Sequence, residues 1–299
     1  MDVRAQKALG QHFLTDLTVA QKIVGTLSQD TGGVPPETPC VASLRNDPGS
    51  VRDVLEIGPG MGVLTQYLLK REDIDLKLVE LDGESVDYLL THFPGMQGRL
   101  YQADYLRLDI HRLFPGPYRV IGNFPYNISS QIFFKIIDNR DLVPEVVCMI
   151  QKEVAERIAE KPGTKTYGIL SVFLQAWYDI EYLFTVGSGA FNPPPKVQSA
   201  VIRLTRNSRT SLGCDEKLFK TVVKTAFGQR RKTLRNSLKP LLASRSFVGT
   251  KPPQDDNVAS GACHFERSEE SPFSDPVFDL RPERLSVEDF IDLTLRLTP

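Results

Sequence analysis

Short apolar runs alternate with longer helical patterns along the chain as far as residue 151. The runs are rich in β-branched residues and lie at 54–57, 76–81, 99–103, 118–123 and 145–151. Strands that alternate with helices at this pitch predict an α/β protein with a parallel sheet that helices cover on both faces. Two further runs, at 178–186 and 200–205, follow each other without a clear long helix between them. They are compatible with an antiparallel pair that closes one edge of the sheet.

Helical periodicity marks the beginning and the end of the chain. Residues 17–28 have apolar spacing compatible with a helix, and a last helix is expected over 286–295, where Ser286 and Asp289 would form a capping box. After Thr205 the pattern is helical, with one apolar stripe made by Phe219, Val222, Val223, Ala226 and Phe227. These patterns predict a first domain over 1–205 and a helical second domain over 206–299.

Two segments interrupt these patterns. Residues 29–50 and 244–276 have little periodicity and many turn-forming residues. We interpret the first as a loop insertion and the second as a flexible insertion.

The composition is that of a soluble protein with one large core and a smaller appendage, because 41% of the 299 residues are apolar and 24% are charged. The cysteines Cys40, Cys148, Cys214 and Cys263 are far apart and form no CxxC pair, so neither a zinc site nor a disulfide framework is expected. No run approaches the roughly 20 apolar residues of a membrane span, and the first residues do not resemble a signal peptide. We expect a cytoplasmic protein without a membrane segment.

The charge is unevenly distributed, although its formal net value is only −1. Residues 217–245 carry nine Lys and Arg side chains and no Asp or Glu. Such a basic segment is a candidate for contacts with nucleic-acid phosphates, although a charge run is also typical of a solvated face.

A glycine-rich turn follows the first apolar run. Gly58, Gly60 and Gly62 come directly after residues 54–57. Glycine there lets the backbone turn tightly and lets a ligand approach it, and the helix that follows offers free amides. Val63 stands where the third glycine of a dinucleotide fingerprint would be, so an adenosyl ligand is favoured over a pyrophosphate cofactor. The pattern alone also fits an ordinary turn.

Two carboxylates at strand ends are candidate cofactor ligands. Glu80 ends the second run, 22 residues after Gly58, near the ~20-residue spacing at which an acidic side chain reaches a ribose hydroxyl. Asp82 is the second candidate for that position. Asp104 follows the third run and would accept a hydrogen bond from an adenine amino group. If each residue is considered alone, the alternative roles are a solvated carboxylate at a strand end for Glu80 and a helix cap for Asp104.

The fourth run ends in Asn123-Phe124-Pro125-Tyr126. The lone pair of an amino group on a base is delocalised into the ring, so acceptors that hold its protons favour its attack. Asn123 supplies one oxygen, and the proline favours an extended Phe124 whose carbonyl would reach the same amino group. Tyr126 offers a ring face to a base that is unstacked into a pocket. The alternative is a strand-end turn with two core aromatic residues.

The chain resembles the rRNA adenine N6,N6-dimethyltransferase family, in particular its bacterial small-subunit (16S) members. The resemblance covers nearly everything except 29–50 and 244–276. Its motifs are LGQHFLTD at 9–16, EIGPGMGVLT at 56–65, VELD at 79–82, AD at 103–104, GNFPYNISSQIFF at 122–134, QKEVAERI at 151–158, FNPPPKVQSAVIRL at 191–204 and FGQRRKTLRNSL at 227–238. Several motifs in the same order are more specific than any one of them.

The resemblance implies a Rossmann-like class I methyltransferase fold with a small C-terminal helical domain and S-adenosylmethionine as cofactor. The implied cofactor ligands are His12 and Leu14 of an amino-terminal arm, Gly58 and Gly60, Glu80 on the ribose, Asp104 on the adenine, and Asn123. The implied catalytic residues are Asn123, Phe124, Tyr126 and Phe191, with Tyr126 and Phe191 sandwiching the target adenine. Many relatives have asparagine where this chain has His12, which would change how the arm closes over the cofactor, and leucine where it has Phe124.

The implied activity is dimethylation of two adjacent adenosines in a 3′-terminal hairpin of 16S rRNA, within an immature small ribosomal subunit, by a monomer that needs no metal. A helix around 227–238 is expected to dock the RNA backbone through Lys224, Arg230, Arg231, Lys232 and Arg235. One alternative is a methyltransferase of the same fold that acts on large-subunit rRNA. Another acts on a protein glutamine, and the arm and FNPPPKV disfavour only this one. A third is a ribosome-assembly factor that transfers no methyl group.

Overall fold

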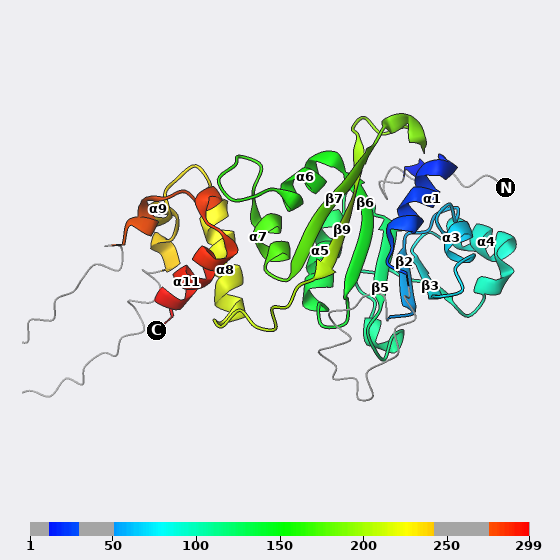
Figure 1. Cartoon of the computed structure of the whole chain (residues 1–299), viewed down its shortest axis with the longest axis horizontal. Coiled ribbons are helices and arrows are strands. Elements are labelled where there is room, and N and C mark those ends of the chain that lie inside the picture. The colour runs from blue at the N-terminus through cyan, green and yellow to red at the C-terminus, as the bar shows by residue number, and fades with distance from the viewer. Residues whose placement is uncertain (1–11, 30–50, 242–274, 299) are drawn as a thin grey trace, which may run out of the picture. The chain divides into compact units, whose positions relative to one another are not determined.

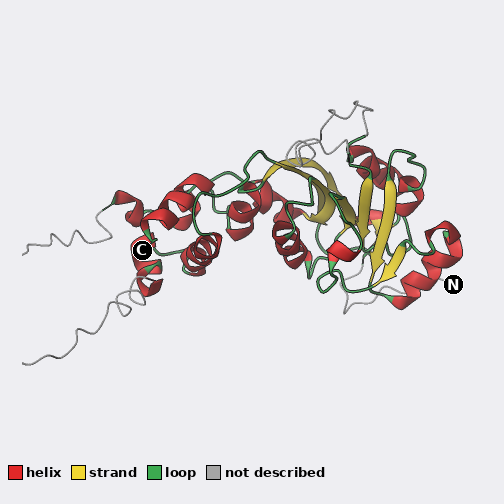
Figure 2. Cartoon of the chain, turned by 90° about the horizontal axis from the view of Figure 1, so that it is seen from below, coloured by secondary structure: helices red, strands yellow, loops and turns green. Residues whose placement is uncertain are grey.

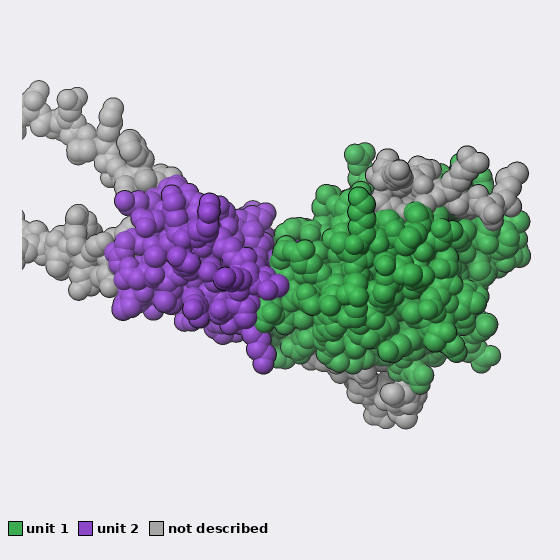
Figure 3. Space-filling model, turned by 90° about the horizontal axis from the view of Figure 1, so that it is seen from above, with its two compact units in different colours: residues 1–160, 173–210 green, residues 161–172, 211–299 purple. Residues whose placement is uncertain are grey.

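The computed structural model describes residues 12–29, 51–241 and 275–298. The chain divides into two compact units, Met1–Glu160 with Phe173–Thr210, and Lys161–Val172 with Ser211–Pro299 (Figure 3). The predicted insertions at 29–50 and 244–276 lie outside the described residues apart from their edges, and Cys40 and Cys263 lie outside them as well.

The first unit is built on a seven-stranded sheet with the order β4-β3-β2-β5-β6-β9-β7 (Figure 1). Its strands are β2 (Asp53–Ile57), β3 (Asp75–Glu80), β4 (Leu100–Gln102), β5 (Arg119–Asn123), β6 (Glu145–Gln151), β7 (Tyr178–Val186) and β9 (Ser199–Arg206). Strands β4, β3, β2, β5 and β6 pair in parallel. Strand β9 is antiparallel to both β6 and β7. The predicted parallel sheet and its antiparallel edge pair are therefore confirmed.

A second, two-stranded sheet joins the amino-terminal segment to a distant part of the chain. Strand β1 (Phe13–Leu14) pairs antiparallel with β8 (Phe191–Asn192), so that Leu14 lies opposite Phe191. The N–H of Thr15 continues the pairing by donating to the carbonyl of Ala190 at 2.8 Å. Two-residue strands give no periodicity, so the sequence did not predict this sheet.

Helices lie on both faces of the seven-stranded sheet (Figure 2). Among the described residues, the α-helices before α8 are α1 (Leu17–Thr26), α3 (Thr65–Leu68), α4 (Gly83–His92), α5 (Ser129–Asp138), α6 (Lys152–Ala159) and α7 (Ile169–Gln175). Single 3₁₀ turns occur at Pro94–Met96, Ile110–Arg112, Ser188–Ala190, Pro276–Asp279 and Pro282–Arg284.

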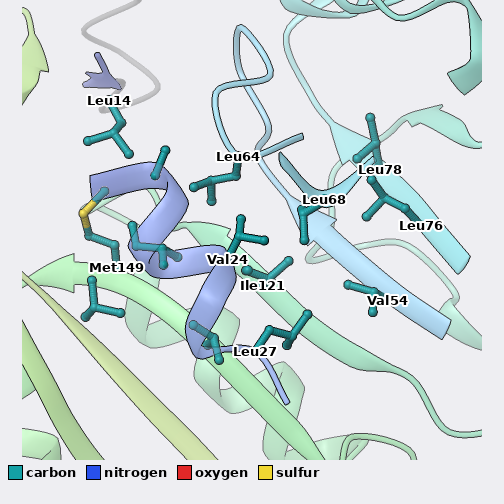
Figure 4. Close-up of a cluster of buried hydrophobic side chains, with 14 of the residues drawn as sticks. Leu14, Val24, Leu27, Val54, Leu64, Leu68, Leu76, Leu78, Ile121 and Met149 are labelled. Atoms are coloured by element: carbon teal, nitrogen blue, oxygen red, sulfur yellow. The ribbon is translucent and has the colours of Figure 1, made fainter. Parts of the chain in front are cut away.

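Helix α1 packs its apolar stripe into the core beside the parallel strands. Val24 and Leu27 belong to the same buried cluster as Val54, Ile121 and Met149 (Figure 4). The helix begins at Leu17 because the Asp16 side chain accepts hydrogen bonds from the N–H groups of the first turn. The predicted helix over 17–28 is confirmed, and it ends two residues earlier than expected.

The carbonyl groups at the end of α1 are bound by three arginines. Arg203 donates to the carbonyl of Thr26, Arg71 to those of Leu27 and Ser28, and Arg119 to that of Ser28. The last carbonyls of a helix have no partner within it and carry partial negative charge, so cationic donors stabilise this end. The arginines fix the helix that follows the amino-terminal arm.

The second unit contains α8 (Glu216–Gly228), α9 (Leu234–Ser237) and α11 (Val287–Arg296). The predicted apolar stripe is confirmed, because all five of its residues are buried on α8. The predicted last helix is confirmed as well, with the capping box between Ser286 and Asp289. No helix among the described residues is long and apolar enough to cross a membrane.

The expected basic helix around 227–238 is wrong. Helix α8 ends at Gly228, residues 229–233 form turns, and α9 begins only at Leu234. Glycine has low helix propensity and is enriched at helix ends, which explains the stop. The cations of this segment therefore lie on a turn and on a four-residue helix.

The second unit also includes Lys161–Val172, which the sequence pattern had placed in the first domain. The Tyr167 ring packs on Phe227 with centroids 6.4 Å apart, and the N–H of Gly163 donates to the carbonyl of Glu283 at 2.6 Å. The first unit continues to Thr210 rather than to Thr205. Such contacts join segments far apart in the chain, so local patterns cannot reveal them.

Candidate active site

A cavity of about 210 Å³ opens in the first unit where β2, β3 and β5 end. The carboxyl ends of parallel strands are where open α/β sheets bind ligands, because the chain leaves the sheet there in loops. Nine of the ten predicted site residues of this unit line the cavity: His12, Leu14, Gly58, Gly60, Glu80, Asp104, Asn123, Phe124 and Tyr126. The structure thus gathers residues from the arm and from four strand ends at one place.

Backbone N–H groups, one of them in the glycine turn, fix the side chain of Glu80. Its Oε2 accepts a hydrogen bond from the N–H of Gly60 at 3.0 Å, and its Oε1 accepts from Leu81 and Asp82 at 2.8 and 3.0 Å. Burial raises the pKa of Glu80, and these three backbone donors act against the rise. Asp82, the second candidate, does not line the cavity and instead caps α4 by accepting from Ser85.

Gly60 must be glycine for two reasons. Its φ of 56° lies in the left-handed region. A Cβ at this position would also lie 2.9 Å from Cε1 of Phe13 in the arm, which is too close for carbon atoms. The glycine turn therefore lets the arm approach the cavity.

Asp104 lies in a segment that is hydrogen-bonded to Lys135 of α5. Its Oδ1 accepts a hydrogen bond from the N–H of Leu106 at 2.9 Å. The Nζ of Lys135 on α5 donates to the carbonyls of Tyr105 and Leu108, each at 2.5 Å, and lies 4.9 Å from the centre of the Tyr105 ring. Sequence reasoning missed Lys135, because nothing in its local pattern links it to residues 27 and 30 positions earlier.

Asn123 is fixed at the end of β5 by the arm. Its Nδ2 donates to the carbonyl of His12 at 3.1 Å, which leaves Oδ1 as the acceptor of this side chain. The preceding Gly122 is required, since a Cβ there would lie 2.5 Å from the carbonyl oxygen of Ile57 on the neighbouring strand. The close approach of β5 to β2 thus places Asn123 beside the glycine turn.

The two aromatic residues of the Asn123-Phe124-Pro125-Tyr126 segment have different environments. Phe124 is buried and packs edge-on against Phe133, with ring centroids 5.9 Å apart, while its N–H donates to the carbonyl of Met149 at 3.0 Å. Tyr126 is partly exposed to the cavity, and its hydroxyl is hydrogen-bonded to the Ser199 hydroxyl. Burial raises the pKa of Tyr126 above its usual value.

Phe191 is the one predicted residue of this unit that does not line the cavity. Its side chain is only 4% exposed and belongs to the buried cluster that also contains Leu14, Val186 and Val201. Its role opposite Tyr126 stays a prediction. In this structure, the ring that stacks on Tyr126 is that of His12, with centroids 5.4 Å apart.

Glu56 is a cavity residue that sequence reasoning missed. It is 1% exposed, and its Oε2 accepts a hydrogen bond from the Thr65 hydroxyl at 2.7 Å. Burial raises its pKa to about 8, and the nearby Glu80 adds to the rise. The available signal was a carboxylate within the otherwise apolar run 54–57, because a charged residue is rarely buried without a reason.

The cavity fits a cationic adenosyl ligand. The carboxylates of Glu80 and Asp104 and the buried carboxyl group of Glu56 line it, and none of the described residues that line it is Lys or Arg. A phosphate-bearing cofactor would face like charges there, whereas a sulfonium and an ammonium group would face opposite ones. Apolar side chains such as Val79, Leu81 and Leu106 complete the lining for a flat base. Among the described residues, no cluster of His, Cys, Asp and Glu could hold a metal ion.

The predicted RNA-binding residues lie in the second unit and fall into two groups. Arg230 contacts the Glu283 carboxylate at 3.9 Å and donates to the carbonyl of Lys165, and Arg235 donates to Asp279. The side chains of Lys224, Arg231 and Lys232 are exposed. The side chains of Arg230 and Arg235 are 35% and 40% exposed, and the RNA contacts of all five residues stay a prediction.

Comparison with known proteins identifies the family of this chain. The family model described as ribosomal RNA adenine dimethylase matches residues 3–252. A protein of Parabacteroides distasonis named ribosomal RNA small subunit methyltransferase A is 56% identical over 98% of this chain and 94% of its own length. A protein of Bacteroides thetaiotaomicron with the same name is 53% identical over 98% of this chain and 93% of its own length.

Solved structures support the fold. A dimethyladenosine transferase from Plasmodium falciparum has a TM-score of 0.69 at 23% identity and covers 96% of each chain. The 23S rRNA methyltransferase ErmE has a TM-score of 0.57 at 23% identity and covers 95% of this chain and 99% of its own. The matches confirm the predicted Rossmann-like methyltransferase fold, the rRNA adenine dimethyltransferase activity and S-adenosylmethionine as cofactor. This chain belongs to the ribosomal RNA adenine dimethylase family.

Proposed function

We propose that this chain dimethylates the N6 amino groups of two adjacent adenosines in a 3′-terminal hairpin of 16S rRNA. The observation that carries the proposal is the position of Asn123. Its amide nitrogen is engaged by the arm, so its oxygen remains as an acceptor, at the edge of a cavity lined by three carboxyl groups. That combination suits an amino group that must meet a cationic methyl donor.

The residues of the chain act mainly by positioning. S-adenosylmethionine supplies an electrophilic methyl group on a sulfonium. The Asn123 Oδ1 and the Phe124 carbonyl would accept the two N6 protons of adenine, and the hydrogen bond from the Phe124 N–H to Met149 holds this backbone in place. Tyr126 would stack on the unstacked base. The chain needs no strong base, because the nitrogen becomes acidic as its bond to the methyl carbon forms and water can take the proton.

The cofactor ligands in this proposal are His12, Leu14, Gly58, Gly60, Glu80, Asp104 and Asn123, all of which line the cavity. Glu80 would bind the ribose hydroxyls with the lone pairs that its backbone donors do not use. Asp104 would accept from the adenine amino group of the cofactor. Phe191 keeps its proposed place opposite Tyr126 on the strength of the family resemblance alone.

The second unit would dock the RNA backbone through Lys224, Arg231 and Lys232, whose exposed side chains can reach phosphates. Arg230 and Arg235 would stabilise this surface through their hydrogen bonds to other residues of the second unit. We further propose that the substrate is an immature small ribosomal subunit, that the protein works as a cytoplasmic monomer, and that it needs no metal.

Methyl transfer from labelled S-adenosylmethionine tests the proposal. Unmethylated small subunits and large subunits are offered separately to the wild type and to Asn123→Ala, and the RNA is digested to nucleosides. We expect dimethyladenosine from small subunits only, and its loss in Asn123→Ala with an unchanged melting temperature. If label appeared only in the large subunit, the proposed substrate would be large-subunit rRNA instead. Tight binding to small subunits without any methyl transfer would indicate an assembly factor instead.

A further inference from the structure

Three segments that are far apart in the chain meet at His12. The backbone carbonyl of His12 accepts from Nδ2 of Asn123 at 3.1 Å. Its ring stacks on that of Tyr126, with centroids 5.4 Å apart and planes inclined by 30°. Its Nδ1 lies 2.9 Å from the carbonyl oxygen of Pro193. One residue of the arm therefore contacts Asn123 and Tyr126, which are two of the side chains proposed to hold the target adenine, and the segment that follows Phe191.

The contact with Pro193 determines the protonation of the ring. A carbonyl oxygen can only accept a hydrogen bond, so Nδ1 of His12 must carry the proton and donate it. This bond fixes the orientation of the His12 ring, and that ring stacks on one face of the Tyr126 ring. The hydroxyl of Tyr126 is hydrogen-bonded to the hydroxyl of Ser199. The Tyr126 ring is therefore braced at its hydroxyl and on a face.

We propose that the imidazole of His12 is a positioning residue for methyl transfer, which acts through Tyr126 in addition to the proposed contact of His12 with the cofactor. The proposal rests on the proposed function of the site and goes beyond the cofactor contact that the family resemblance implies. A side chain that braces Tyr126 restricts the ring on which the target adenine stacks, and restricted partners raise the rate of the chemical step. Removing the brace should therefore lower kcat by a larger factor than it weakens cofactor binding.

Three substitutions separate the two interactions of the ring. His12→Phe keeps an aromatic ring without the N–H donor, His12→Asn keeps a donor without the ring, and His12→Ala removes both. All three keep the backbone carbonyl that binds Asn123. His92→Ala is a matched control. The His92 ring also stacks on a tyrosine, with its centroid 3.8 Å from that of Tyr88, and its Nδ1 lies 2.8 Å from the backbone carbonyl oxygen of Tyr88. His92 does not line the cavity.

We expect His12→Ala to lower kcat about tenfold, which corresponds to the upper range of one aromatic contact. His12→Phe should recover most of that loss and His12→Asn little of it, and His92→Ala should match the wild type. The dissociation constant of S-adenosylmethionine, measured by calorimetry, should rise by a smaller factor than kcat falls in His12→Ala. A loss of cofactor affinity equal to the loss of kcat, or a His12→Phe variant no better than His12→Ala, would overturn the proposal.

Nuclear magnetic resonance provides a readout that does not depend on methyl transfer. The chain has four histidines, so labelling their ring nitrogens with ¹⁵N gives few signals, and the His12 signals are those missing from His12→Ala. We expect His12 as the Nδ1–H tautomer. An Nε2–H tautomer would contradict the brace itself, whereas a wild type with the expected tautomer and no dimethyladenosine product would contradict only the proposed function.

Discussion

Arg235 donates two hydrogen bonds to one carboxylate oxygen of Asp279, from Nε at 3.0 Å and from Nη2 at 2.9 Å. This pair joins α9 to the 3₁₀ turn at Pro276–Asp279, 44 positions away in the chain. An arginine held in this way joins two segments of the second unit, whereas the side chains of Arg231 and Lys232 are exposed. The basic segment therefore contains structural cations as well as candidate RNA ligands, and substitutions can tell them apart.

The double substitution Arg231→Gln/Lys232→Gln should weaken RNA binding. Both side chains are exposed, and removing each phosphate-binding cation should reduce the slope of log affinity against log salt by about 0.7 to 0.9. Titration of labelled hairpin RNA at several salt concentrations measures the slope. Arg235→Gln is the matched control, for which we expect a smaller change in slope and a loss of stability below about 1 kcal/mol, as is usual for half-exposed ion pairs. Identical slopes in the wild type and the double variant would exclude Arg231 and Lys232 as phosphate ligands.

Lys135→Met should weaken cofactor binding without touching the cavity. The ammonium group holds the carbonyls of Tyr105 and Leu108, so its loss frees the segment that carries Asp104. We expect a threefold to tenfold rise in the dissociation constant, which corresponds to about 0.6 to 1.4 kcal/mol and to the range of one ordinary hydrogen bond. Lys77→Met is the control, because Lys77 also donates to a carbonyl, that of Leu113 at 2.7 Å, and lies over an aromatic ring, but Leu113 does not line the cavity, whereas Tyr105 does. Equal effects of both substitutions would refute a specific role of Lys135.

Glu56→Gln should change how stability depends on pH. The pKa of Glu56 is about 8 in the folded protein and 4.5 as the reference value for the unfolded chain. Between these values the folded state holds a proton that the unfolded state has released, so the free energy of unfolding falls as pH rises. One such group contributes a slope of up to about 1.4 kcal/mol per pH unit. Denaturant unfolding from pH 5 to pH 8 should give a shallower decline in Glu56→Gln, and parallel curves would contradict the elevated pKa.

Arg119→Met should destabilise the first unit strongly. Arg119 is fully buried, donates to the carbonyl of Ser28 and lies 4.0 Å from the Glu145 carboxylate. Removing one partner of a buried ion pair leaves the other charge uncompensated, which costs about 3 to 5 kcal/mol. Arg52→Met is the control, since Arg52 binds Asp75 and a carbonyl at the surface and should cost less than about 1 kcal/mol. A loss for Arg119→Met no larger than for Arg52→Met would show that the buried pair stabilises little.

The sequence alone was sufficient to place the strands of the large sheet along the chain and to find most of the cavity. Each of these strands is a run of apolar residues with its own turn signals, so its position is a local property. Glu80, Asp104 and Asn123 could be placed together because the carboxyl ends of parallel strands share one edge of a sheet. Glu56 and Gly122 were missed because their roles depend on contacts with neighbouring elements.

Only the tertiary structure decided which cations hold the second unit together, that Lys161–Val172 belongs to it, and that His12 stacks on Tyr126. Arg230, Arg231 and Arg235 look alike in the sequence, since charge and helix propensity do not reveal a partner far away along the chain. The same holds for His12, which the chain brings to Asn123 across 111 positions through the pairing of β1 with β8. Local patterns determine elements because their causes are local, whereas the partner of a side chain depends on how distant elements pack.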